Sequence, residues 1–188
     1  MREGNINWQP GNLENNLVSL LPLTEHDFDR LYSVASDPLL WEQHPSKRYE
    51  RNVFEEFFAG AIASKTAFVI RDKLSGEAIG STRFYEYNEA EKSIAIRYTF
   101  LARRCWGGRY NRAVKELMIN YAFHHVDKVI FHIAATNLRS QIATARFGAI
   151  KTNDFFVQTG TERLSYEYTL YKDIWINSDS RDTGLPTQ

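Results

Sequence analysis

The sequence predicts a mixed α/β (α+β) fold, in which one central, mostly antiparallel sheet carries helices on both faces. The chain has 188 residues, a length that suits one domain with its own core. Segments of alternating apolar and polar residues are interleaved along the chain with segments of helical periodicity. Three strand-like segments in the middle follow one another through short polar turns, as in an antiparallel meander. This mixed order is typical of a single sheet covered by helices.

The amino-terminal part of the chain predicts a strand followed by two helices. Residues 17–23 have the apolar composition of a first strand. Thr24, with Asp27 three residues later, resembles an imperfect capping box at the start of a helix. The helix itself has an apolar stripe made of Phe28, Leu31, Tyr32 and Ala35. A second helix is expected over residues 52–64, with Val53, Phe54, Phe57, Phe58 and Ile62 at helical spacing.

The meander is expected over residues 67–101, and the most regular helix of the chain follows it. The three strands cover residues 67–72, 78–87 and 93–101, and the polar turns KLSGE and NEAEK separate them. From residue 109 to residue 126, an apolar set is linked by steps of three and four positions. It consists of Tyr110, Ala113, Val114, Leu117, Met118, Tyr121, Ala122 and Val126. That spacing predicts one amphipathic helix over the whole stretch.

The carboxy-terminal part predicts a strand, a helix and two further strands. The segment KVIFHIAA at residues 128–135 has the composition of a strand buried on both faces. A helix is expected over residues 137–147, ended by Gly148. The last two strands are expected at residues 149–158 and 163–172, joined by the turn TGTE.

Both ends of the chain differ in composition from this folded part. Residues 1–15 are polar and are expected to form a flexible arm, and residues 16–172 form the domain. From residue 173 to residue 188 the periodicity is lost while Ser, Asp, Gly and Pro become frequent, which predicts a tail.

Composition argues against several classes of protein. Lys and Arg number 23, and Asp and Glu number 23, so the formal net charge is zero. A neutral chain lacks the basic surface of a general nucleic-acid binder or a membrane-surface protein, so neither partner is expected. Cys105 is the single cysteine, and together with five histidines it shows no metal-ligand spacing. With no hydrophobic signal segment at the start, a reducing, cytoplasmic compartment is expected.

A basic, glycine-containing segment lies between an expected strand end and an expected helix start. Glycines at such a place let the backbone approach a ligand closely, and the first turn of the helix offers unpaired N–H groups. Arginine side chains add charge-assisted hydrogen bonds, so the segment suits a pyrophosphate. A solvated basic turn in front of a helix is the alternative reading. The residues are Arg103, Arg104, Cys105, Trp106, Gly107, Gly108, Arg109, Tyr110 and Asn111.

A second polar segment follows the buried strand. Asn137 and Ser140 lie one helical turn apart at the start of the next expected helix, and Gly148-Ala149 follows its end. By itself Asn137 is more often a helix cap than a ligand, and Ser140 is more often a tolerated helix residue.

Together, the two segments resemble the Gcn5-related N-acetyltransferases, and most of all the ribosomal-protein-alanine acetyltransferases of RimJ/RimL type. The phosphate-loop pattern of that family matches Arg104-x-x-Gly107, with Arg109 in place of a small third residue. The second signature matches Asn137-x-x-Ser140 and then Gly148, with Ala149 where Phe is usual. The resemblance covers roughly residues 17–171.

The resemblance implies a function and a set of site residues. The chain would be an acyltransferase that uses acetyl-coenzyme A as co-substrate, with a sheet that splays open between residues 93–101 and 128–135. Thr99, Phe100 and Leu101 would hold the pantetheine arm and the acetyl carbonyl, and the loop around residues 103–111 would hold the pyrophosphate. Asn137 would bond the pantetheine, and Ser140 would lie near the thioester sulfur. Arg83, Tyr85 and Tyr98 would line the acceptor site, and a homodimer is plausible.

The general base is not assigned by this resemblance. Many relatives have a glutamate at the position of Ala95 and a tyrosine at the position of Thr144, and this chain has neither. Glu86 and His132 are the candidates, although Glu86 also suits a solvated strand end and His132 a hydrogen-bonded strand residue. The acceptor would be a small-molecule amine or a protein amino terminus, acetylated directly in a ternary complex. The alternatives are a catalytically silent acyl-coenzyme A sensor and, less well supported, a nucleic-acid binder.

Overall fold

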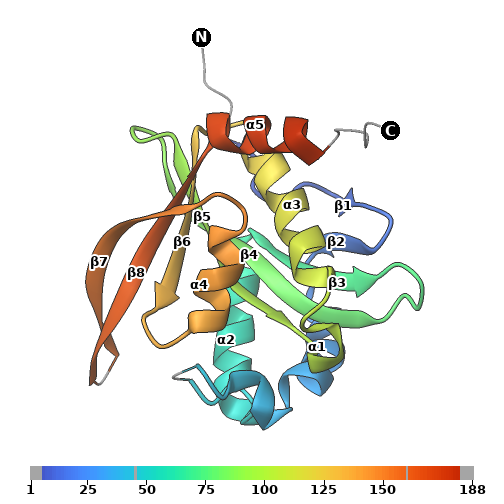
Figure 1. Ribbon diagram of the computed structural model, residues 1–188. Helices are drawn as coiled ribbons and strands as arrows, with labels where there is room; N and C mark the ends of the chain where they lie inside the picture. Colours follow the sequence, from blue (N-terminus) through green and yellow to red (C-terminus); the bar gives the residue numbers. More distant parts are fainter. Residues whose placement is uncertain (1–5, 45, 160, 183–188) are drawn as a thin grey trace. The chain divides into compact units, whose positions relative to one another are not determined.

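The computed structural model describes residues 6–44, 46–159 and 161–182, and it contains a mixed sheet of eight strands in the order β1-β2-β3-β4-β5-β6-β8-β7 (Figure 1). The pairs β1–β2, β2–β3, β3–β4, β6–β8 and β7–β8 are antiparallel, whereas β5 and β6 are parallel. The predicted mixed, mostly antiparallel sheet is therefore confirmed. The strands are β1 Leu13–Glu14, β2 Val18–Pro22, β3 Ala67–Asp72, β4 Ala78–Asn88, β5 Ser93–Leu101, β6 Lys128–Ala134, β7 Ile150–Thr159 and β8 Thr161–Tyr171.

The helices lie close to their predicted positions. They are α1 Phe28–Ala35, α2 Arg51–Ser64, α3 Tyr110–Ala122, α4 Leu138–Ala145 and α5 Lys172–Asp182, with short 3₁₀ turns η1 Glu25–Asp27, η2 Pro38–Trp41 and η3 Arg103–Cys105. The expected capping box is present, because the Thr24 N–H donates to Asp27 Oδ2 at 3.0 Å. Arg71 of β3 also donates to the buried Asp27 carboxylate, at 3.2 Å. The start of the first helical segment is thereby tied to the sheet.

The chain divides into two compact units, and the first comprises the residues up to Tyr85 together with Ile96–Tyr121. In this unit successive residues of β3 alternate between two cores. Ala67 and Val69 join a cluster with Leu31 of α1 and Phe54 of α2. Phe68 points the other way and packs edge to face on Phe84, whose ring also contacts Trp8 and Tyr121 of α3. Helices therefore cover both faces of this part of the sheet, as predicted.

The second unit comprises Glu86–Ala95 and the residues from Ala122 onward. The start of β5 pairs with β6 in parallel over three residues only, Ser93–Ala95 against Lys128–Ile130. β6 pairs with β8 along its whole length, from Lys128 opposite Tyr171 to Ala134 opposite Ser165. The parallel pairing of β5 with β6 is therefore short, whereas the pairing of β6 with β8 covers the whole of β6.

Three expectations about the elements require correction. Helix α3 ends at Ala122 rather than near residue 126, because residues 123–125 form a turn instead of a further helical turn. Strand β6 is not buried on both faces: Val129, Phe131 and Ile133 are buried while the residues between them are partly exposed. The apolar composition of this segment indicated two buried faces, whereas only one face of β6 is buried in the structure.

The third correction concerns the ends of the chain. The segment expected as an irregular tail is helical up to Asp182, and Trp175 of this helix is buried against Phe147, with 6.1 Å between the ring centroids. In the expected amino-terminal arm, Trp8 is buried against Phe84, with 5.2 Å between the ring centroids, and Leu13–Glu14 form strand β1. The rest of both segments, residues 1–5 and 183–188, lies outside the described residues.

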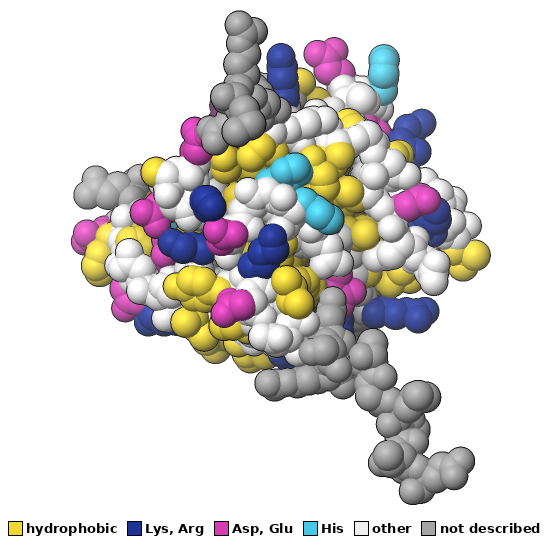
Figure 2. All heavy atoms as spheres, turned by 90° about the horizontal axis from the view of Figure 1, so that it is seen from above, with side chains coloured by type: hydrophobic (Ala, Val, Ile, Leu, Met, Phe, Trp, Pro, Cys, Tyr) yellow, Lys and Arg dark blue, Asp and Glu magenta, His cyan; other side chains and the backbone are white. Residues whose placement is uncertain are grey.

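Charges of both signs are mixed on the surface. On the face shown in Figure 2, Lys and Arg side chains are interspersed with Asp and Glu side chains, in keeping with a formal net charge of zero. Among the described residues, none of the helices is long and apolar enough to cross a membrane.

Candidate functional site

The loop between β5 and α3 is built from short-range hydrogen bonds that fix its course. The Ala102 N–H donates to the Ile79 carbonyl at 2.8 Å, which anchors the start of the loop to β4. The Cys105 and Trp106 N–H groups then close the 3₁₀ turn by donating to the carbonyls of Ala102 and Arg103. The Trp106 indole Nε1–H donates to the Leu101 carbonyl at 2.9 Å. Trp106 is thus a positioning residue for the loop.

The loop leads into the amino terminus of α3 through Gly107. Gly107 has φ = +67°, a left-handed conformation that side chains other than glycine rarely adopt. A Cβ atom added at Gly108 would meet nothing within 4 Å, so that position is open. Helix α3 follows, and its Ala113 N–H donates to the Arg109 carbonyl at 2.9 Å. The first turn of an α-helix directs its backbone N–H groups outward, so this terminus fits an anionic ligand such as a pyrophosphate.

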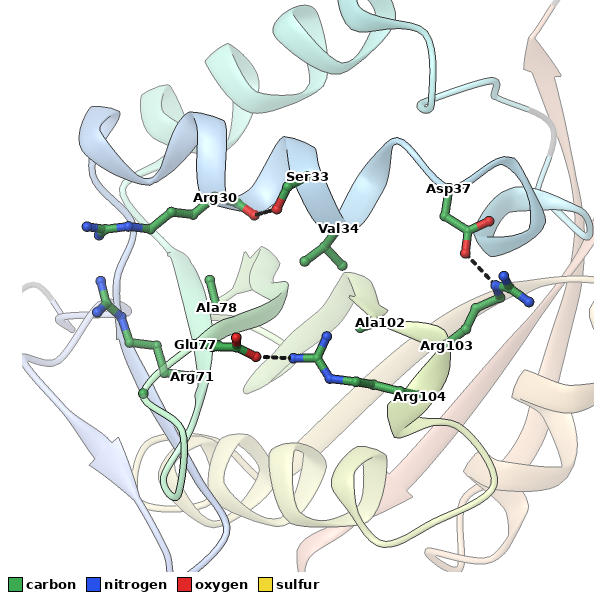
Figure 3. Close-up of a pocket in the computed structure, with 11 residues that line it drawn as sticks. Arg30, Ser33, Val34, Asp37, Arg71, Glu77, Ala78, Ala102, Arg103 and Arg104 are labelled. Atoms are coloured by element: carbon green, nitrogen blue, oxygen red, sulfur yellow. Dashed lines mark hydrogen bonds and ion pairs between the residues drawn. The ribbon is translucent and has the colours of Figure 1, made fainter.

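The arginines of the loop differ in their partners. Arg103 donates to Asp37, and the hydrogen bond holds the pKa of that carboxyl below its usual range. Arg104 donates to Glu77 at 2.7 Å. Figure 3 shows both pairs at the edge of a pocket of about 640 Å³ between α1, the β3–β4 turn and the start of the loop. Arg109 is exposed and, within the described part of the chain, is in no ion pair, so its guanidinium is available to a phosphate.

Tyr110, expected among the cofactor residues, has a structural partner. Its hydroxyl donates to Asp72 Oδ2 at 2.5 Å, and this bond raises the pKa of Tyr110 while lowering that of Asp72. The side chain thereby ties the first turn of α3 to the end of β3. Asn111 follows in the same turn and is partly exposed.

The end of β5, which carries Thr99, Phe100 and Leu101, lies unusually close to β4. A Cβ atom at Gly80 would lie 2.0 Å from the Phe100 carbonyl oxygen, so only glycine permits this approach of the two backbones. The Phe100 ring is buried against Trp41, with 5.3 Å between the ring centroids. These contacts fix the backbone of Phe100 while its side chain remains in the core. The sequence analysis did not identify Gly80, although a glycine inside a strand is a signal of close approach.

Lys115 of α3 is a buried ionisable residue, and the periodicity of the helix did not predict its burial. Its Nζ donates to Thr99 Oγ1 at 2.8 Å, and Thr99 Oγ1 is also 2.7 Å from Thr82 Oγ1. Burial lowers the pKa of Lys115 to about 7. An ionisable group is therefore bonded to one of the three residues expected to hold the pantetheine arm.

The three residues expected at the acceptor site lie together. The Arg83 guanidinium carbon lies 4.0 Å from the centroid of the Tyr98 ring, and the Tyr85 and Tyr98 rings meet edge to face at 5.7 Å. The structure adds two arginines that the sequence analysis missed. Arg97 lies 5.3 Å and Arg48 lies 5.8 Å from the Tyr98 centroid.

Asn137 and Ser140 lie at the start of α4 in the second unit. The Asn137 Oδ1 accepts the Ser140 N–H at 3.1 Å, so Asn137 caps this helix. In the parts of the chain that the structure describes, neither the Asn137 Nδ2 group nor the Ser140 hydroxyl has a hydrogen-bond partner. Both groups can therefore bond to a ligand without giving up a contact.

The two candidate bases also lie together in the second unit, with a third group. His132 Nδ1 is 3.9 Å from Glu86 Oε2, and His132 Nε2 is 3.4 Å from Glu167 Oε2. Glu86 is exposed and has φ = +50°, a conformation uncommon for a residue with a side chain. Glu167, on β8, was missed because it is 35 residues from His132 in the sequence. Ala95 and Thr144, which take the positions where the family resemblance led to an expected Glu and Tyr, are both buried.

The expected site residues are therefore divided between the two units. The first unit contains the loop, the end of β5 and the Arg83–Tyr85–Tyr98 group, and the second contains Asn137, Ser140, Glu86 and His132. Cys105 is buried, and burial raises the pKa of its thiol, as befits a core residue. Groups of three or more potential metal ligands are absent from the described residues.

Solved structures resemble this fold closely although their sequences differ. A GCN5-related N-acetyltransferase from Brucella melitensis matches with a TM-score of 0.79 at 20% identity, covering 92% of this chain and 85% of that one. A spermidine N-acetyltransferase from Vibrio cholerae, in complex with CoA and spermine, matches with a TM-score of 0.68 at 17% identity, over 87% and 100% of the two chains. A candidate ribosomal-protein-serine acetyltransferase from the same organism has a TM-score of 0.73 at 12% identity, over 85% and 97%.

The sequence itself identifies the family. Curated proteins give no significant match to this chain. Residues 18–150 match the acetyltransferase (GNAT) domain family. The matched range includes both the loop that leads into α3 and the start of α4. The chain therefore belongs to the GNAT family of acetyltransferases.

Proposed function

We propose that the protein transfers the acetyl group of acetyl-coenzyme A directly to a primary amine, in a ternary complex. The observation that carries this proposal is the loop from Arg103 to Gly108, in which the left-handed Gly107 leads into the amino terminus of α3. An anion site at a helix start, directly after a strand whose end is fixed by its close approach to Gly80 of β4, suits a nucleotide thioester. Membership of an acetyltransferase family supports the same reaction.

In this proposal each segment of the site holds one part of the co-substrate, which supplies the acetyl group as a thioester. The backbone of Thr99, Phe100 and Leu101 binds the pantetheine arm and the acetyl carbonyl. The N–H groups from Gly107 onward and the Arg109 side chain bind the pyrophosphate. Arg103 and Arg104 contribute positive charge, because exposed ion pairs such as theirs are weak enough to rearrange.

The acceptor amine must lose a proton, and Glu86 and His132 are the proposed acceptors of that proton. An α-amine has a reference pKa of about 8, so it needs little help near neutrality. A proton that reaches His132 would lie between the Glu86 and Glu167 carboxylates, which are within 4 Å of its ring nitrogens. Positioning of the amine is then the main contribution of the enzyme.

Substitutions at the start of α4 separate the roles of Ser140 and Asn137. Ser140→Ala removes the hydroxyl proposed to bond the leaving sulfur, and we expect kcat to fall about tenfold with little change in the Kd for acetyl-coenzyme A. Asn137→Asp retains a side-chain oxygen that can cap α4 but removes the Nδ2–H donors. It should weaken cofactor binding without a loss of stability.

The measurements are release of free thiol in the presence of an amine panel, and calorimetry with acetyl-coenzyme A. Asn137→Ala is the matched control, because it removes both the donor and the helix cap and should also lower stability by about 1 kcal/mol. Unchanged kcat in Ser140→Ala leaves Ser140 as a surface residue of α4. Tight binding without thiol release for any amine would instead support a catalytically silent acyl-coenzyme A sensor.

Three finer assignments also remain proposals. The motifs favour the RimJ/RimL-type branch, and the single, buried Cys105 suits a reducing, cytoplasmic compartment. The same branch resemblance suggests a homodimer. Light scattering at working concentration tests the last point, and a monomer mass would contradict it.

A further inference from the structure

Three arginines surround a single tyrosine ring in the first unit, and we call Arg48, Arg83 and Arg97 the arginine cluster. Their guanidinium carbons lie 5.8, 4.0 and 5.3 Å from the centroid of the Tyr98 ring. They come from three parts of the chain: the segment before α2, strand β4 and strand β5. Arg48 also lies 4.2 Å from the centroid of Phe57, so a second aromatic ring contacts the cluster.

The cluster lacks counter-charges. Within the described ranges of the chain, none of the three guanidinium groups has a carboxylate within ion-pair distance. Arg83 donates to the Gly60 carbonyl at 2.7 Å, but its buried Nε has no hydrogen-bond partner. Burial lowers the pKa of Arg48 to about 10, and the charges of Arg97 and Arg83 add to this effect.

Arg51 shows that this arrangement is not simply how arginines pack on aromatic rings in this protein. Arg51 lies 5.1 and 5.2 Å from the centroids of Phe28 and Tyr32. It also pairs with two carboxylates, Asp29 at 3.6 Å and Glu55 at 3.2 Å. The arginine cluster has the aromatic contacts without the carboxylates, as a site that waits for an external anion would.

The backbone at the centre of the cluster is strained. Tyr98 has φ = +58°, a left-handed conformation that is an outlier for a bulky side chain. Residues held in such conformations concentrate at ligand sites, where the surrounding structure imposes them. This strain is a second observation, independent of the charges, that marks the same place.

We infer that the acceptor is a small amine that also carries a carboxylate, and that the arginine cluster binds this carboxylate. The inference rests on the proposed function, in which Arg83, Tyr85 and Tyr98 line the acceptor site. A planar guanidinium matches a carboxylate with two parallel hydrogen bonds, and the carboxylate supplies the negative charge that the three guanidinium groups lack. A small ion suits a partly buried cluster, and a polyamine is repelled by it because both carry positive charge.

The first experiment compares acceptors in matched pairs, with free thiol release as the measurement. Free amino acids are compared with their primary amides, which keep the α-amine and lose the carboxylate, and spermidine is the polycation. For the accepted amino acid we expect kcat/KM to exceed that of its amide about 10- to 100-fold, since a hydrogen bond to a charged group contributes about this much. Spermidine should be the poorest acceptor.

The second experiment changes Arg97, whose side chain forms no hydrogen bond or ion pair in the described part of the fold. Arg97→Gln should lower kcat/KM for the amino acid about tenfold or more, through KM, and should lower kcat/KM for the amide much less. For Arg97→Lys, kcat/KM for the amino acid should lie between those of wild type and Arg97→Gln, because lysine keeps the charge and loses the planar fork of hydrogen-bond donors. Arg51→Gln, which removes a ring-stacked arginine outside the cluster, is the control. It should change kcat/KM neither for the amino acid nor for the amide.

The outcomes distinguish this inference from the proposed function. The inference is overturned if amides or spermidine are acetylated with the same kcat/KM as amino acids. It is also overturned if Arg97→Gln affects both members of a pair equally. Either result leaves the proposed acetyl transfer unaffected. If only peptides with acidic residues are acetylated, the inference that the acceptor is a small molecule is overturned. If no amine supports thiol release, the proposed function fails. The anion site is then tested separately by calorimetry with glutarate, a small dicarboxylate. Equal affinity of wild type and Arg97→Gln for glutarate overturns the anion site as well.

Discussion

At the scale of single residues, the most unusual feature is a lysine in the interior of the first unit. Lys115 is 8% exposed, and its Nζ donates to Thr99 Oγ1, which is itself bonded to Thr82. Transfer of an ammonium group out of water is unfavourable, and the pKa of Lys115 falls to about 7 for this reason. Near neutral pH the side chain is therefore divided between its two protonation states.

This lowered pKa predicts how stability depends on pH. Above pH 10.5 the amine is neutral in both the folded and the unfolded chain, and its ionisation has no effect. As pH falls toward 7, the unfolded chain binds a proton that the folded chain does not, so the folded state loses stability. Below about pH 7 the full loss is present, roughly 5 kcal/mol at about 1.36 kcal/mol per pKa unit.

The variant Lys115→Met tests this expectation. It should unfold at higher denaturant concentration than wild type at pH 6, and its advantage should shrink by roughly 2 to 3 kcal/mol between pH 6 and pH 9. The measurement is urea unfolding of both proteins at each pH. Lys47→Met, at a lysine whose side chain is 69% exposed, is the control and should show no such trend. An advantage of Lys115→Met that is the same at both pH values would contradict the prediction.

At the scale of elements, the close approach of β4 and β5 is the contact that sets the end of β5. A Cβ atom added at Gly80 would lie 2.0 to 3.1 Å from three backbone atoms of Phe100 and Leu101. Backbone atoms held in a sheet yield less readily than the end of a flexible side chain. Any side chain at position 80 must therefore displace the part of β5 proposed to hold the thioester.

We expect Gly80→Ala to weaken acetyl-coenzyme A binding at least tenfold and to lower the free energy of unfolding by about 1–3 kcal/mol, the usual effect of overpacking. Calorimetry and urea unfolding measure the two effects. Gly60→Ala is the matched control: Gly60 lies in α2 with nothing within 4 Å of an added Cβ, and alanine there should stabilise the helix by up to about 1 kcal/mol. Full affinity in Gly80→Ala would show that the end of β5 can move without consequence for the cofactor.

At the scale of the whole molecule, a formally neutral chain carries a local excess of positive charge. The total balances at 23 basic and 23 acidic residues, yet the arginine cluster and Arg109 are in no ion pair among the described residues. The positive charge is therefore placed where anionic ligands are proposed to bind rather than spread over the surface. A neutral total with charged sites suits selective binding of small anions.

Ligand binding should be visible in the stability of the molecule. Acetyl-coenzyme A at 100 times its Kd should stabilise the folded chain by about 2.7 kcal/mol, which corresponds to a rise in Tm of roughly 5–10 °C for a chain of this size. Thermal unfolding across a concentration series measures the shift, and calorimetry should give one molecule per chain. Adenosine at the same concentration, which lacks the pyrophosphate, is the control. A Tm that stays constant up to millimolar acetyl-coenzyme A would argue against the proposed function.

Much of the fold, and the loop before α3, could be predicted from the sequence alone. The period of apolar residues places α2, α3 and the three meander strands within a few residues of their observed bounds, except at the end of α3. These predictions succeed because periodicity and glycine chemistry act between near neighbours in the chain. The capping box of Thr24 and Asp27 at η1, which leads into α1, and the capping of α4 by Asn137 are local in the same way.

Only the tertiary structure decided which distant residues meet. Lys115 lies within a helix whose stripe does not include it, and it is buried because Thr99 of β5 packs against it. Arg97 and Tyr98 are neighbours in a strand and would ordinarily point to opposite faces, but the left-handed φ of Tyr98 interrupts that alternation. Arg48 joins them from about 50 residues away. Such convergence depends on packing between elements, which no local pattern of residues encodes.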